Sequence, residues 1–101
     1  MKFEELWEYL QTSLQVGDEI PHWSVSEKYD KTEFTIVEMS DFEIKIKTSK
    51  NANVSIPRKD FETIFNNWDE YLKKKVLRKE LRDIPNRNTT YVISILHKMK
   101  L

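Results

Sequence analysis

A run of basic residues between positions 73 and 87 is the part of this sequence whose residue types best suit a chemical task. It holds seven cations, namely Lys73, Lys74, Lys75, Arg78, Lys79, Arg82 and Arg87. On a helix, four of them would share one face through their i, i+3, i+4 and i+7 spacing: Lys75, Arg78, Lys79 and Arg82. Such a face can neutralise phosphates, with Tyr71 or Tyr91 nearby for stacking on a base. The segment therefore suits contact with nucleic acid or with an acidic protein surface.

The charge of the whole chain favours a protein partner over nucleic acid. The formal net charge is zero and the pI is about 6.7, whereas nucleic-acid-binding domains are usually basic. The zero conceals an asymmetry, since residues 1–43 carry eleven acidic and three basic side chains, while residues 44–101 carry six acidic and fourteen basic ones. Opposite charges of this kind neutralise each other within one fold or between two subunits.

The aromatic content also favours assembly. Phe, Trp and Tyr make up 12% of the chain, and so many large rings are hard to bury fully in 101 residues. We therefore expect a homodimer, or a complex with another protein, that buries some of four apolar residues: Trp7, Trp23, Tyr91 and Met99. The expected function is a non-enzymatic binding or interaction module that self-associates. Nucleic-acid binding through the basic face is the alternative.

No other residue pattern indicates catalysis, a metal or a cofactor. The two histidines, His22 and His97, stand in no HxxxH or HxxE spacing that would bring two metal ligands together. Acidic pairs such as Glu4 and Glu8 would share an exposed helix face, the usual place for solvated charge. The serines lack a nucleophile-elbow context, and a single glycine cannot make a phosphate-binding loop. An enzyme is therefore not expected.

The helix predicted over residues 61–76 is expected to anchor the core. Its apolar residues form one continuous stripe at helical spacing: Phe61, Ile64, Phe65, Trp68, Leu72 and Val76. Pro57 suits the entry to this helix because its φ is already restricted. The aromatic members of the stripe are expected to be buried against a sheet, on Phe34, Ile36, Ile44 and Ile46.

A first helix and a run of short strands precede it. Residues 2–14 carry a helical stripe, ended by Gly17 as a left-handed cap residue. Residues 20–23, broken by Pro21, form an edge strand or an extended entry, and residues 28–32 are predicted to be a polar loop. Period-two apolar residues then predict strands around Phe34–Met39, Phe42–Ile46 and Val54–Ile56, with turns at Ser40 and Asn51.

The C-terminal region is predicted to return to helix. Residues 77–83 continue as a short helix that Pro85 stops. Residues 89–100 have helical apolar spacing but a strand-favouring composition, and we predict a helix capped by Asn88 or Thr89. The fold class is therefore α+β: an N-terminal helix, a small curled antiparallel sheet of three or four strands, and C-terminal helices packed on it.

Several of these anchor residues also resemble a known group of proteins. The pattern comprises Gly17-Asp18, Trp23, Phe34-Thr35-Ile36, Asp60-Phe61, Ile64-Phe65, Trp68, Tyr71, Arg78 and the segment 90–97. It resembles short uncharacterised bacterial proteins encoded as orphan reading frames in mobile DNA, including integron gene cassettes. The resemblance spans residues 16–98 and implies a shared fold, with no catalytic residue to carry over. It makes the alternative function that of an accessory protein of a mobile element.

Length and composition predict one cytoplasmic domain over residues 1–101. The absence of cysteine fits a reducing compartment. The first ten residues lack the basic start and apolar core of a signal peptide. No apolar run approaches the ~20 residues that cross a bilayer, so we expect no membrane partner.

Overall fold

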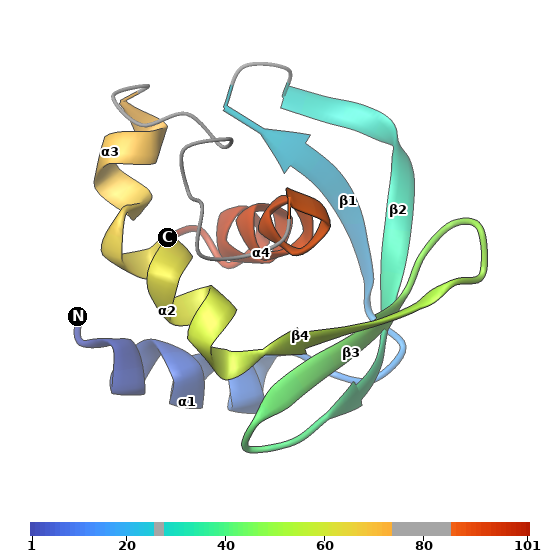
Figure 1. Ribbon diagram of the computed structural model, residues 1–101, viewed down its shortest axis with the longest axis horizontal. Helices are drawn as coiled ribbons and strands as arrows, with labels where there is room; N and C mark the ends of the chain where they lie inside the picture. The colour runs from blue at the N-terminus through green and yellow to red at the C-terminus, as the bar shows by residue number, and fades with distance from the viewer. Residues whose placement is uncertain (26–27, 74–85) are drawn as a thin grey trace.

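A four-stranded antiparallel sheet curls around a central helix in the computed structural model of the chain (Figure 1). The structure describes residues 1–25, 28–73 and 86–101. Its elements in chain order are α1 (Phe3–Ser13), β1 (Glu19–Ser24), β2 (Lys28–Met39), β3 (Glu43–Lys47), β4 (Asn53–Pro57), α2 (Arg58–Asn66), α3 (Trp68–Leu72) and α4 (Asn86–Lys98). The strands follow the order β1-β2-β3-β4. The predicted α+β fold, with helices on a small curled antiparallel sheet, is confirmed.

The hairpin of β3 and β4 follows its sequence pattern closely. Ile44 pairs with Ile56 and Ile46 with Val54, so the inward residues of both strands face the core opposite each other. The turn between them places Asn51 at φ +64°, a left-handed conformation that Asn tolerates.

Phe42 departs from the prediction, because it precedes β3 and 79% of its surface is exposed. The Ser40 hydroxyl accepts hydrogen bonds from the backbone N–H groups of Phe42 and Glu43, which turns the chain before the strand begins.

Strand β2 contradicts the predicted loop at residues 28–32. The strand already begins at Lys28, and a bulge interrupts it: one residue of β1, His22, lies opposite three residues of β2 between two paired positions. Inside the bulge, the Asp30 carboxylate accepts hydrogen bonds from the backbone N–H and the hydroxyl of Thr32, each at 2.7 Å. These bonds lower the pKa of Asp30. The bulge destroys the period-two pattern, which is why the polar residues resembled a loop.

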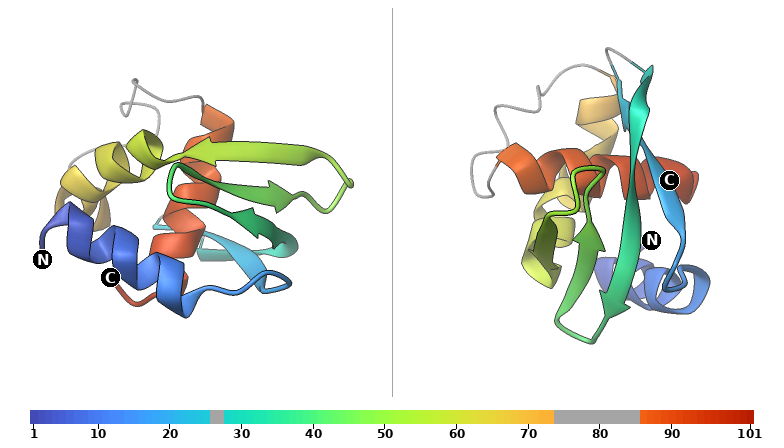
Figure 2. Two further views of the ribbon diagram at one scale, coloured as in Figure 1. Left: turned by 90° about the horizontal axis from the view of Figure 1, so that it is seen from below. Right: turned by 90° about the vertical axis from the view of Figure 1, so that its right-hand side faces the viewer.

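Helix α4 occupies the centre of the fold. It crosses the strands on the inner face of the sheet and also contacts α2 (Figures 1 and 2). Nearly every side chain from Asn88 to Leu96 is buried, so this stretch of the helix is enclosed on all sides. The helix prediction for the C-terminal segment is confirmed. Its predicted cap is not, because α4 already begins at Asn86 and the Asn88 amide instead donates to Asp60.

The predicted helix over residues 61–76 is neither continuous nor central. Helix α2 begins directly after Pro57, as expected, but the chain breaks at Asn67 before α3. The Asn67 side chain donates to the carbonyl of Thr63 at 2.8 Å, and its backbone leaves helical geometry. Phe61 and Trp68 are buried, whereas Phe65 is only half-buried. The predicted short helix over residues 77–83 lies outside the described residues.

Helix α1 agrees with its predicted stripe, but it ends differently. Leu14 is the C-cap residue in an extended conformation, and Gly17 lies in the turn that follows. Gly17 does have the predicted positive φ, +98°, and its N–H donates to the Ile36 carbonyl at 2.7 Å. The glycine therefore docks the turn onto β2 and does not cap the helix.

The open edge of β1 is closed by two side chains from the helical layer. The Trp23 N–H donates to Ser94 Oγ of α4 at 3.0 Å, and the Val25 N–H donates to Tyr71 Oη of α3 at 3.0 Å. Backbone groups at a sheet edge need such partners once water is excluded. As a result, β1 is held beside the C-terminal half of α4.

Candidate ligand-binding hollow

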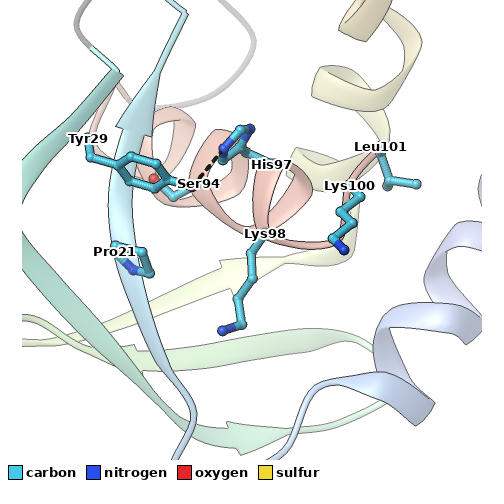
Figure 3. A pocket seen from close by; sticks show the side chains of 7 residues that line it. All are labelled: Pro21, Tyr29, Ser94, His97, Lys98, Lys100 and Leu101. Carbon is cyan, nitrogen blue, oxygen red and sulfur yellow. Dashed lines mark hydrogen bonds between the residues drawn. The ribbon is translucent and has the colours of Figure 1, made fainter.

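A hollow of about 580 Å³ lies where β1 and the start of β2 meet the C-terminal end of α4 (Figure 3). We call it the α4 hollow. Its lining residues are Pro21, Tyr29, Ser94, His97, Lys98, Lys100 and Leu101. The volume falls in the range of about 300–1,000 Å³ that small-molecule sites occupy.

His97 is held in place on one side of the hollow by two aromatic neighbours. Its imidazole stacks on Trp23 with ring centroids 3.8 Å apart and an interplanar angle of 1°. Its Nε2 atom lies 3.0 Å from the hydroxyl of Tyr29, and the two rings meet edge to face. Burial lowers the pKa of His97, and the nearby charge of Lys28 lowers it further. The imidazole is therefore neutral at pH 7, and its orientation is set before any ligand arrives.

Two lysines line the hollow together with this imidazole, and a third lies near the Trp23 ring on which the imidazole stacks. Lys98 and Lys100 extend from the end of α4 beside the hollow (Figure 3), where the helix dipole also favours cations. Lys28 lies at the start of β2, with its Nζ atom 5.8 Å from the centroid of the Trp23 ring. In the described part of the chain, the ion pairs are those of Lys45 with Glu38 and Glu43. The three lysines around the hollow thus have no carboxylate partner among the described residues.

The second histidine lies in a different environment. His22 packs against the rings of Phe34 and Tyr91, with centroids 5.1 and 5.4 Å away. Burial lowers its pKa, and the negative charge of Asp30 opposes that shift. Within residues 1–25, 28–73 and 86–101 there is no group of three His, Asp or Glu side chains that could hold a metal ion.

The residues expected at an interface are mostly part of the core. Trp7, Trp23 and Tyr91 are buried, and Met99 is half-buried against the same cluster. The fold buries eight of the twelve aromatic side chains, whereas Tyr9, Tyr29 and Phe42 are exposed and Phe65 is half-buried. Self-association itself stays a prediction. Among the described residues, Phe42 is the most exposed large apolar side chain, and two α1 side chains hold its turn by donating hydrogen bonds to the carbonyls of residues 40 and 41.

The predicted basic face lies outside the described residues. Its members are Lys75, Arg78, Lys79 and Arg82, so their role in contacting nucleic acid or a partner stays a prediction. The structure gathers a different set of cations, at the α4 hollow. Sequence analysis missed this set because Lys28 and Tyr29 lay in the presumed loop. The available signal was the segment 97–100, HKMK, where two lysines follow a histidine.

Comparisons with known proteins do not assign a family. No protein-family model, no curated protein and no solved structure matches the chain. The resemblance to orphan proteins of mobile DNA accordingly stays a prediction. Each helix in the described part of the chain is too short or too polar to cross a membrane.

The two histidines make stability depend on pH in a defined direction. Because burial lowers both pKa values in the folded chain, the unfolded chain binds more protons at mildly acidic pH. The free energy of unfolding should therefore fall as the pH drops below the ordinary histidine value of about 6.5. Urea unfolding at about pH 7.5 and about pH 5.5 measures this, since most carboxylates stay ionised over that window. The decrease in unfolding free energy between the two pH values should be smaller in His97→Gln and in His22→Gln than in the parent. Equal stability of the parent at both pH values would contradict this prediction.

Proposed function

We propose that this chain is a non-enzymatic binding module that holds an anionic ligand in the α4 hollow. The observation that carries the proposal is the set of lysines around the hollow, which lack carboxylate partners among the described residues. Unpaired cations beside a concave, partly apolar surface attract an anion. The water that they lose when the anion binds is replaced by charge-assisted hydrogen bonds to the anion. The neutral His97 adds a hydrogen-bonding group that needs no rearrangement.

The state of the remaining polar groups supports binding over catalysis. The Ser94 hydroxyl donates to the Thr90 carbonyl at 3.0 Å and accepts the Trp23 N–H, so it serves the fold. His97 is engaged with Tyr29 and stacked on Trp23. None of the described residues that line the hollow has a carboxylate side chain that could orient a general base. This arrangement favours holding a ligand over activating one.

The lysines provide the test of this proposal. In a titration with inorganic pyrophosphate at low salt, exchanging both Lys98 and Lys100 for Gln should weaken binding about tenfold or more, because two charge-assisted contacts are lost. The resonances of His97 should shift on binding to the parent protein. Raising the salt concentration should weaken the parent's binding as well.

A matched control variant removes the same two positive charges from a different part of the surface. Lys47 and Lys50 lie exposed at the hairpin of β3 and β4, away from the lining of the hollow. Exchanging both for Gln should leave pyrophosphate affinity within about twofold of the parent, since neither lysine lines the hollow or can form a charge-assisted contact with an anion bound there. An equal loss in both double variants would mean that overall charge, and not the hollow, attracts the anion. A parent that binds no pyrophosphate at low salt would also refute the proposal.

A further inference from the structure

We infer that the ligand of the α4 hollow is a nucleoside phosphate, with its base on the ring of Tyr29 and its phosphate at Lys98 and Lys100. The inference rests on the proposed function and names the class of anion. Tyr29, which would contact the base, and the two lysines, which would contact the phosphate, lie on opposite sides of one hollow (Figure 3).

The aromatic half of the argument is the exposure of Tyr29. The residue is 59% exposed, while the neighbouring Trp23, its partner in the β1–β2 pairing, is buried. Its position is nevertheless defined, because the hydroxyl bonds His97 Nε2 and the ring edge packs against the imidazole, with centroids 5.5 Å apart. Pro21 of β1 adds a second flat apolar surface to the same wall. An exposed ring in a fixed orientation offers a stacking surface, and little further conformational entropy of the side chain is lost when a ligand stacks on it.

The charged half is the position of the lysines relative to that ring. Lys98 and Lys100 approach the hollow from the end of α4, whereas Tyr29 belongs to β2 (Figure 3). A simple anion would use the lysines and leave Tyr29 unused. A ligand with a planar ring and a phosphate separated by a sugar can use both. Stacking on aromatic rings combined with cationic contacts to phosphate is the chemistry by which proteins bind nucleotides and single strands.

His97 is placed to contact the part of the ligand between these two ends. It lines the hollow between Tyr29 and the lysines, and one ring nitrogen is occupied by the Tyr29 hydroxyl. With Nε2 engaged, the other nitrogen of the neutral imidazole is left to donate or accept one hydrogen bond, which suits a sugar hydroxyl better than a second phosphate.

The test compares ligands that share a phosphate and differ in the base. Adenosine 5′-monophosphate should bind the parent protein about tenfold more tightly than ribose 5-phosphate, because stacking on one base adds that much affinity. Tyr29→Ser should abolish this advantage, so that the variant binds the nucleotide and ribose 5-phosphate with affinities within about twofold of each other. Tyr29→Phe, which keeps the ring and loses the hydroxyl, should retain most of it. Since Tyr29 is exposed, both variants should fold, and circular dichroism checks this.

The outcomes separate this inference from the proposed function. Equal affinity for the nucleotide and ribose 5-phosphate, with Lys98 and Lys100 still required, would overturn the nucleoside assignment and leave anion binding intact. Binding of neither compound at low salt would overturn both. A short single-stranded oligonucleotide and a duplex identify the source of the nucleoside phosphate. If the single strand binds more tightly than the mononucleotide, the ligand is a nucleic acid strand; if the mononucleotide binds more tightly, the ligand is a free nucleotide. Either result supports the inference. Binding of the duplex alone would contradict it, because a paired base cannot reach Tyr29.

Discussion

Replacing Phe61 by alanine is expected to lower the free energy of unfolding by about 3–5 kcal/mol. The side chain of Phe61 is 0% exposed, and its ring meets Trp7 of α1 edge to face at a centroid distance of 5.3 Å. Neighbours on α1, α4 and the sheet cannot all collapse into the space that the ring vacates. A loss of this size approaches the whole stability of many small domains, so the variant should be largely unfolded well below the parent's melting temperature.

Phe65 supplies the matched comparison for this prediction. It lies one turn further along α2 and carries the same ring, but it is only half-buried and contacts Phe3 at 6.0 Å. Phe65→Ala should therefore cost about half as much as Phe61→Ala, on the order of 2 kcal/mol. Urea unfolding of both variants gives the two values. If Phe65→Ala proves as damaging as Phe61→Ala, the orientation of α2 described above is wrong.

A buried polar pair between α2 and α4 should produce the second largest effect. Asn88 Nδ2 donates to Asp60 Oδ2 at 2.9 Å, and only 1% of Asp60 is exposed. Asp60→Ala is expected to destabilise the fold by about 2–3 kcal/mol, because it leaves a buried amide without its charged acceptor. The carboxylate also lies in the first turn of α2, where the helix dipole favours negative charge.

A double-mutant cycle isolates the contribution of this pair. Asp60→Ala, Asn88→Ala and the double variant should show a coupling energy of about 1–2 kcal/mol by urea unfolding. Glu62→Ala removes an exposed carboxylate from the same helix and should change stability by less than about 0.5 kcal/mol. Additive effects of the two core substitutions would show that Asp60 and Asn88 do not act on each other.

Local periodicity was sufficient to predict those elements with one face on the core and the other in water. In α1 the apolar residues recur at helical spacing, and in β3 the isoleucines alternate with lysines, so each pattern is compatible with one structure only. The turn at Asn51 and the positive φ of Gly17 followed from residue type for the same reason, since few other residues tolerate that backbone conformation. The α+β class follows from the order of these elements.

The centre of the fold and the candidate site depend instead on contacts between distant segments. Residues 88–96 of α4 are almost all buried, so this stretch has no exposed face to reveal its orientation, whereas the exposed faces of α2 made its stripe look like the main anchor. The bulge in β2 depends on its pairing with β1, which no local pattern records. The hydrogen bond from Tyr29 to His97 spans 68 positions of the chain. Side chains so far apart in the sequence meet only because the sheet curls over α4 and the Ser94 hydroxyl fixes β1 beside that helix. Their proximity is therefore a property of tertiary packing and not of spacing along the sequence.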